Sequence, residues 1–199
     1  EKVTSKKDTI GLGIDNGDFV AIDTKFEFTE SGYVKTRFLD DKASVFILVT
    51  YLQRLKEMKK TPKCNLKVIF TTYEEVGHGA SQVPAIDELL AVDMGCIGTD
   101  LSCTEEQVSI CAKDGSGPYD YKMVSKLIEL AKKEEINYAV DIYPFYSSDA
   151  SAALRGGADI KGALIGPGIH ASHGMERTHI EGIINTIKLV ESYIDNINE

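Results

Sequence analysis

The sequence predicts an α/β fold with three layers, in which helices cover both faces of a central sheet. From Asp40 onward, short runs of β-branched and aromatic residues alternate with longer amphipathic segments. Such alternation is typical of a sheet covered by helices. The first 37 residues have no helical period and contain only short extended runs. We therefore expect two parts: the end of a β-rich subdomain at residues 1–37 and an α/β domain at residues 38–199.

Short extended runs make up the first part. They lie at residues 10–14, 19–22, 25–28 and 33–36. The triplets Asn16-Gly17-Asp18 and Glu30-Ser31-Gly32 lie between runs and have the residue types of tight turns. We interpret the runs as two to four strands of a β subdomain that continues upstream of Glu1. Because the chain begins with Glu rather than Met, we expect it to be processed, trimmed or incomplete at that end.

The second part contains the predicted layers. We expect helices at residues 40–60, 119–134, 149–155 and 180–194, and strands at residues 66–73, 89–93, 139–143 and 160–165. Asp40-Asp41 can cap the first of these helices. The predicted buried face of that helix consists of Val45, Leu48, Val49, Leu52 and Leu55. Gly156-Gly157 ends the helix that begins at Asp149.

The composition narrows the range of partners. Lys and Arg number 22 and Asp and Glu number 31 among the 199 residues, so the formal net charge is −9. Nucleic acids and anionic membranes require basic patches, and we expect neither as a partner. The longest apolar run, residues 45–49, is far shorter than the ~20 residues of a spanning helix, and no signal peptide is evident. The four cysteines show no Cys-x-x-Cys spacing, which favours buried thiols in a reducing compartment. These features predict a cytoplasmic protein.

Carboxylates and histidines follow the ends of several predicted strands. Glu74-Glu75 follows the strand at 66–73, Asp93 closes the next strand, and three histidines follow residue 165. Ligands of open α/β sheets bind beyond the carboxyl ends of the strands. Taken singly, Glu74-Glu75 is typical of surface acids and Asp40-Asp41 of a helix cap. Together these carboxylates and histidines suit two divalent ions bridged by one acid. One glutamate of the Glu74-Glu75 pair would then be a ligand and its neighbour a base.

Five motifs occur in a particular order along the chain. They are Leu39-Asp40-Asp41-Lys42-Ala43, Glu74-Glu75-Val76-Gly77-x-Gly79-Ala80, Val92-Asp93, Ser148-Asp149-Ala150 and Ala171-Ser172-His173. This order resembles the dinuclear metallo-aminopeptidases of the glutamyl and deblocking aminopeptidase family, which often assemble into tetrahedral shells. The resemblance implies a homo-oligomeric enzyme that removes N-terminal residues from peptides with a free N-terminus.

The resemblance implies ligands for two divalent ions, zinc or cobalt. Asp40 would bridge both ions, Glu75 and His173 would complete one site, and Asp93 would bind the other ion. His173 matches the family's terminal histidine motif better than His170 does.

The resemblance also implies two roles in catalysis. Glu74 would be the general base that activates a metal-bridging hydroxide, and Asp149 would lie near the bound substrate. In the family, the ion at the position of Asp93 also takes a histidine from a segment upstream of the inserted β subdomain. All four histidines of this chain lie after Asp40. We therefore expect the chain to be the C-terminal part of a longer aminopeptidase, with a weak or absent ion at Asp93.

Two other functions remain open from the sequence. The chain is either the enzyme just described or a non-catalytic oligomerising or peptide-binding fragment that has lost one metal site. A related carboxypeptidase or amidase on the same scaffold is a third hypothesis, which a requirement for a free substrate N-terminus would distinguish.

Overall fold

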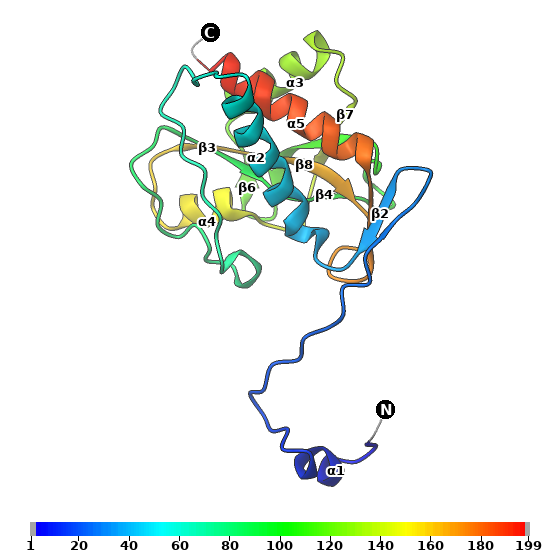
Figure 1. Cartoon of the computed structure of the whole chain (residues 1–199). Coiled ribbons are helices and arrows are strands. Elements are labelled where there is room, and N and C mark those ends of the chain that lie inside the picture. Colours follow the sequence, from blue (N-terminus) through cyan, green and yellow to red (C-terminus); the bar gives the residue numbers. More distant parts are fainter. Residues whose placement is uncertain (1–2, 198–199) are drawn as a thin grey trace.

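A mixed six-stranded sheet forms the centre of the molecule, and helices lie on both of its faces (Figure 1). The structure is a computed structural model and describes residues 3–197 of the 199. The predicted α/β class with helix, sheet and helix layers is confirmed by this arrangement. Among residues 3–197, none of the helices has the length and apolar character needed to cross a lipid bilayer.

The sheet is built around its two longest strands, β5 and β8. Its strands are β3 (Glu88–Val92), β4 (Gly95–Cys96), β5 (Val108–Asp114), β6 (Gly117–Pro118), β7 (Tyr138–Ile142) and β8 (Lys161–Ile169). The order is β3-β8-β5-β6, with β4 also paired to β8 and β7 to β5. β5 and β8 run antiparallel and place Ile110 opposite Ile165, whereas β3 lies parallel to β8. Both isoleucines are fully buried, so the core is centred on these two strands.

Three helices cover one face of the sheet and one short helix covers the other. α2 (Leu39–Glu57), α3 (Tyr121–Lys133) and α5 (Ile180–Asp195) pack together on one face, while α4 (Asp149–Arg155) packs against β3 and β8. α3 begins at Asp120, whose side chain accepts a hydrogen bond from the backbone N–H of Met123. The helices predicted at 119–134, 149–155 and 180–194 therefore form within a few residues of the expected bounds.

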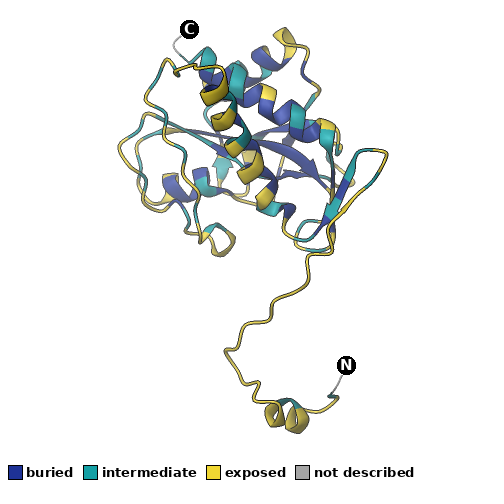
Figure 2. Ribbon diagram, in the orientation of Figure 1, coloured by how far each residue is buried: buried dark blue, intermediate teal, exposed yellow. Residues whose placement is uncertain are grey.

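The N-terminal part differs from its prediction in two places. Helix α1 (Lys6–Gly11) overlaps the extended run expected at residues 10–14, and no strand forms at 19–22. Ser5 accounts for the helix, because its hydroxyl accepts a hydrogen bond from the backbone N–H of Asp8 and caps the first turn. α1 buries none of its residues, and Figure 2 shows this end of the chain as exposed.

A small second sheet connects the N-terminal part to the rest of the chain. It has the order β1-β2-β9 and consists of β1 (Glu27–Phe28), β2 (Tyr33–Thr36) and β9 (Glu176–His179), all antiparallel. β9 follows the loop that carries His173, and Thr36 lies opposite Glu176. Because β2 leads directly into α2, this pairing brings the start of α2 close to the His173 loop.

The start and the buried face of α2 differ from the prediction. Asp40 and Asp41 have non-helical backbone angles, and neither caps the helix with its side chain. The buried residues are Leu39, Ala43, Ser44, Ile47, Tyr51 and Leu55. Of the predicted face only Leu55 is buried, and Val45, Val49 and Leu52 are exposed. The helix is apolar on more than one side, so the sequence did not identify the side that contacts the sheet.

The strand predicted at residues 66–73 does not form. Residues 65–70 have no assigned secondary structure, and within residues 3–197 no backbone group is hydrogen-bonded to the backbone of residues 65–71. The residue types have high β-propensity, but a strand needs a neighbouring strand to satisfy its backbone groups.

Candidate metal centre

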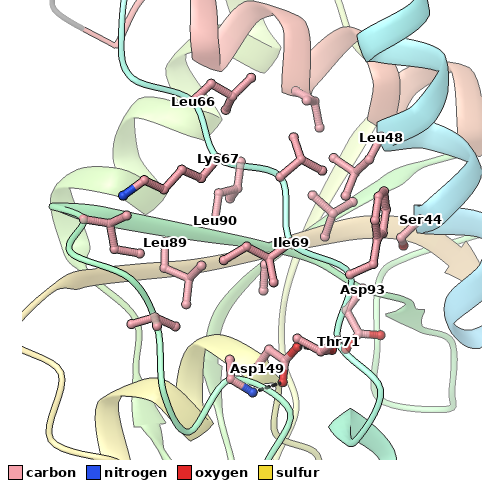
Figure 3. Close-up of a pocket in the computed structure, with 18 of the residues that line it drawn as sticks. Ser44, Leu48, Leu66, Lys67, Ile69, Thr71, Leu89, Leu90, Asp93 and Asp149 are labelled. Carbon is pink, nitrogen blue, oxygen red and sulfur yellow. Dashed lines mark hydrogen bonds between the residues drawn. The ribbon is translucent and has the colours of Figure 1, made fainter.

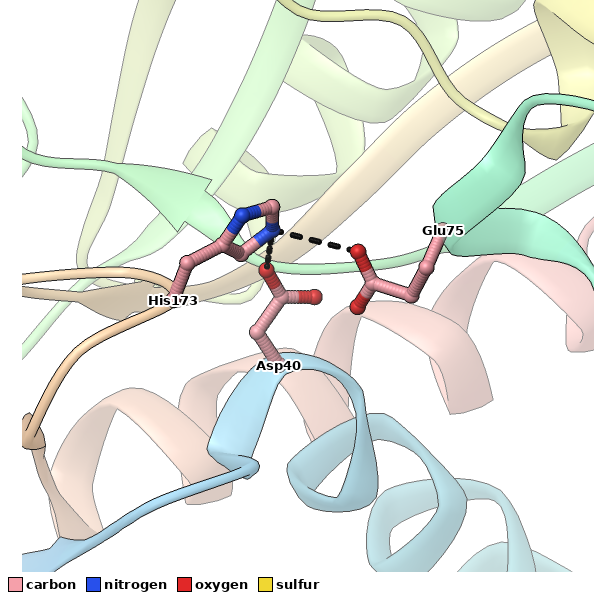
Figure 4. Close-up of side chains that lie close together, drawn as sticks. All are labelled: Asp40, Glu75 and His173. Atoms are coloured by element: carbon pink, nitrogen blue, oxygen red, sulfur yellow. Dashed lines mark ion pairs between the residues drawn. The ribbon is translucent and has the colours of Figure 1, made fainter. Parts of the chain in front are cut away.

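Three side chains from distant parts of the chain meet at one point. Asp40 belongs to the first turn of α2, Glu75 to the short 3₁₀ helix η1 (Glu74–Val76), and His173 to the loop between β8 and β9 (Figure 4). The Nε2 atom of His173 lies 3.2 Å from Oδ2 of Asp40 and 3.1 Å from Oε2 of Glu75. One ligand atom from each side chain lies within 4.8 Å of the others. Two carboxylates and one imidazole are a donor set that zinc accepts. His170 lies outside this group.

A second group shares Asp40 with the first. Asp40, Asp41 and Asp93 also bring one carboxylate oxygen each within 4.8 Å of one another. Asp93 comes directly after β3, and Asp41 comes directly after Asp40. Asp40 therefore occupies the position of a bridge between two donor sets. Asp41 was not among the ligands predicted from the sequence.

The electrostatics of the second group favour a cation. Burial raises the pKa of Asp41 and of Asp93 well above the usual value, and neighbouring carboxylates raise both pKa values further. The Oδ1 atom of Asp41 is buried and has no hydrogen-bond partner among the residues that the structure describes. Crowded buried acids cost free energy unless protons or cations neutralise them. The donor set and the unpartnered oxygen therefore fit a divalent ion.

Glu74 lies beside both groups without belonging to either. Together with Asp40, Glu75, Asp93 and His173 it lines a cavity of about 270 Å³. Burial, followed by the charge of Asp149, raises the pKa of Glu74 to about 7. A carboxylate with such a pKa can accept a proton near neutral pH, which suits a general base.

The buried carboxylate of Glu176 connects the two backbone segments that carry Asp40 and His173. Its Oε2 accepts hydrogen bonds from the backbone N–H groups of Leu39 (2.5 Å) and Asp40 (3.2 Å), and its Oε1 accepts one from His173 (3.0 Å). Glu176 is only 1% exposed. The hydroxyl of Ser172 also donates to Oδ2 of Asp40 at 2.9 Å. The sequence analysis assigned Glu176 no role. Its position three residues after His173 is the signal that could have identified it.

Glu176→Gln should weaken metal binding at the centre and destabilise the fold. Glutamine keeps one acceptor oxygen but turns an amide toward backbone N–H donors, so at least one buried donor loses its partner. We expect the free energy of unfolding in urea to fall by about 1–3 kcal/mol. Affinity for Zn²⁺ should fall about 10–100-fold, as for other residues that orient ligands. Calorimetric titration measures the affinity, and Glu129→Gln, at an exposed site on α3, is the matched control. Equal behaviour of the two variants would contradict this role.

Asp149 holds the loop that carries the two glutamates. Its Oδ2 accepts a hydrogen bond from the Thr71 hydroxyl (2.6 Å), and its Oδ1 accepts one from the backbone N–H of Ala80 (2.9 Å). Gly79 permits this approach, because a Cβ there would lie 2.5 Å from Oδ1 of Asp149 and 2.8 Å from the backbone N of Glu74. Both carboxylate oxygens thus contact the protein, and a role in substrate binding stays a prediction.

A central sheet covered by helices on both faces, with Asp40 shared by two candidate donor sets and Glu74 beside them, is typical of α/β hydrolases with an acid-rich site. Comparison with protein families identifies the particular group: the model of the M42 glutamyl aminopeptidases matches residues 1–189. The chain belongs to this family.

Similar proteins support the same assignment. The chain is 46% identical over 198 residues to the putative aminopeptidase YhfE of Bacillus subtilis (strain 168). This match covers 98% of the chain but only 57% of the relative, so the chain spans little more than half of the relative's length.

Solved structures agree with the fold. The TET1 peptidase of Pyrococcus horikoshii, described as assembling into a tetrahedron or a large octahedral shell, superposes with a TM-score of 0.79 at 25% identity. That match covers 96% of this chain and 58% of the other. The aminopeptidase APDkam598 of the archaeon Desulfurococcus kamchatkensis gives a TM-score of 0.82 at 20% identity. It covers 97% of this chain and 57% of the other, and at that identity it supports the fold alone.

Proposed function

We propose that the chain carries the active site of a metal-dependent aminopeptidase. The observation that carries the proposal is the position of Asp40, which belongs to two donor sets beside the half-buried Glu74. Family membership supports peptide hydrolysis as the reaction. The substrates would be peptides with a free N-terminus.

Each residue has a separate task in this proposal. Bound divalent ions would polarise the scissile carbonyl and acidify a water molecule. Asp40, Glu75 and His173 would hold one ion, and Asp40 and Asp93 the other, with Asp41 as a further donor. Glu74 would take the proton of the attacking water and pass it to the leaving amine, because it is the adjacent carboxylate outside both donor sets.

The organisation of the protein is also part of the proposal. Residues 1–37 would be the end of a β-rich subdomain and residues 38–199 the catalytic α/β domain. We propose a cytoplasmic homo-oligomer that uses zinc or cobalt. The mixed carboxylate and imidazole donors suit both metals, and the shell-forming TET1 peptidase supports self-assembly.

The direct test combines metal binding with hydrolysis. The purified chain is titrated with Zn²⁺ and with Co²⁺ by calorimetry and then incubated with aminoacyl anilides and their N-acetylated counterparts. We expect metal binding and cleavage of the free-amine substrates only. Cleavage of the acetylated substrates would contradict the aminopeptidase assignment, and metal binding without any hydrolysis would favour a peptide-binding fragment.

A further inference from the structure

A buried carboxylate outside the metal centre has no task in the proposed function. Asp114 lies at the end of β5, is 1% exposed and belongs to neither donor set. Within residues 3–197 it forms no ion pair with a lysine, arginine or histidine. Its Oδ1 instead accepts a hydrogen bond from the backbone N–H of Ser116 at 2.7 Å. Burying a carboxylate without a cation is costly unless hydrogen bonds satisfy its oxygens, so the groups that donate to Asp114 are central to its role.

Hydroxyl groups satisfy the other oxygen of Asp114. Its Oδ2 accepts hydrogen bonds from the hydroxyls of Tyr119 (2.7 Å) and Ser151. Because the single Tyr119 proton is directed to Asp114, the Tyr119 oxygen accepts from the Ser148 hydroxyl, which lies 2.7 Å away. We call these four buried residues, Asp114, Tyr119, Ser148 and Ser151, the Asp114 cluster. A carboxylate only accepts hydrogen bonds, so Asp114 sets the direction in which the hydroxyls of the cluster donate.

The Asp114 cluster holds the first turn of α4. Ser148 is the N-cap of this helix, and its backbone N–H donates to the hydroxyl oxygen of Ser151 at 3.2 Å. Asp114 comes from β5, and Tyr119 lies between β6 and α3, so the cluster connects α4 to the central sheet. Buried polar networks whose members are all paired make the elements that they join more rigid. The position of α4 relative to the sheet therefore depends on this cluster.

Asp149 extends the connection to the loop at residues 71–80. It follows Ser148 directly, and Figure 3, a view of the cavity that Thr71 and Asp149 both line, shows these two side chains pointing toward one another. The two carboxylate oxygens of Asp149 accept hydrogen bonds from the Thr71 hydroxyl and from the backbone N–H of Ala80. These two donors lie at opposite ends of the loop that carries the glutamates of the metal centre. A shift of the first turn of α4 therefore moves both ends of that loop.

We propose that Asp114 is a positioning residue for the loop that carries Glu74 and Glu75. Through Tyr119 and the two serines it fixes the first turn of α4, and Asp149 in that turn fixes the loop. Asp114 is not a catalytic residue, because it neither belongs to a donor set nor lines the cavity at the metal centre. The consequence for metal binding rests on the proposed function, whereas the connection from Asp114 to the loop can be measured without metal.

The first test measures that connection by amide exchange and mass spectrometry on the metal-free chain. Asp114→Asn replaces one acceptor oxygen by an amide and leaves a buried donor unpaired. Tyr119→Phe is the milder variant, because it removes one hydroxyl and keeps the shape of the ring. In both variants we expect a peptide covering residues 71–80 to exchange at least about 5-fold faster, the effect of one lost hydrogen bond.

Tyr193→Phe is the matched control for this test. Tyr193 is also buried, and its hydroxyl also donates to a carboxylate, Oε2 of Glu88, at 2.8 Å. Glu88 begins β3, whereas Asp93 of the metal centre follows the other end of that strand. The control therefore loses an equivalent hydrogen bond at a distance from the loop, and it should leave the exchange of residues 71–80 unchanged.

The second test shows whether Asp149 transmits the effect to the metal centre. Calorimetric titration with Zn²⁺ should give an affinity about 2–30-fold lower in Tyr119→Phe, the range for residues that act through packed neighbours. In the Asp149→Ala background the loop is no longer held, so the addition of Tyr119→Phe should lower the affinity no further. A general loss of stability would have the same effect in both backgrounds.

Two outcomes would overturn the inference. One is unchanged exchange of residues 71–80 in both variants of the Asp114 cluster, and the other is an equal loss of Zn²⁺ affinity with and without Asp149. If the unaltered chain binds no Zn²⁺ but the exchange effect is present, the proposed function fails and the positioning role of Asp114 stands.

Discussion

Glu74→Gln is expected to abolish peptide hydrolysis while the metal content of the protein stays nearly unchanged. The Glu74 carboxylate lies at the cavity of both donor sets but supplies no atom to either. Glutamine has a similar shape and cannot accept the proton of the attacking water. Loss of a general base costs about 10²–10⁴-fold in rate. Aminoacyl-anilide hydrolysis measures the rate, and elemental analysis of the purified variant measures the metal.

The neighbouring residue gives the matched control for this prediction. Glu75 lies 3.1 Å from Nε2 of His173 and belongs to the first donor set. Glu75→Gln should therefore lose metal, and it should lose activity as a result of that loss. If Glu74→Gln loses metal and Glu75→Gln keeps it, the two roles are reversed.

The helices were predictable because their signals are local. The helix at residues 121–133 has an amphipathic sequence and an N-terminal Asp120 that caps it, and the helix at 149–155 ends at Gly156. The strand that we wrongly predicted at residues 66–73 shows that strand formation does not follow from local signals alone. Its residue types favour a strand, but strand formation depends on a partner at a distant position. The buried strand β5 was missed because Ser109 and Lys113 interrupt its apolar run.

The ordered motifs identified positions that the structure brings together, and they missed two residues whose importance depends on backbone geometry. Asp40, Glu75 and His173 form one group, and Asp93 joins Asp40 in the other. Asp41 joins this second group because the backbone at the start of α2 is not helical. Glu176 acts through backbone N–H groups, which have no residue-specific signature in the sequence.

Asp40→Ala should reduce binding of both ions, and this is the largest effect that we expect on metal content. Its carboxylate oxygens belong to both donor sets, so one substitution removes a ligand from each. Substitution of a residue that only orients a ligand lowers metal affinity about 10–100-fold. Loss of a shared ligand should lower the affinity for each ion by more than about 100-fold. Calorimetric titration with Zn²⁺ measures both sites, and Asp100→Ala, at an exposed position, is the control.

Stability of the metal-free protein separates this explanation from simple unfolding. The charge of Asp40 contributes to the raised pKa values of Asp41 and Asp93, which means that the three carboxylates repel one another when no cation is present. Removing Asp40 relieves that repulsion. The metal-free variant should therefore resist urea at least as well as the unaltered chain, although it no longer gains stability from Zn²⁺. If Asp40→Ala lost stability without metal and kept one tight site, Asp40 would be a structural acid rather than a bridge between two ions.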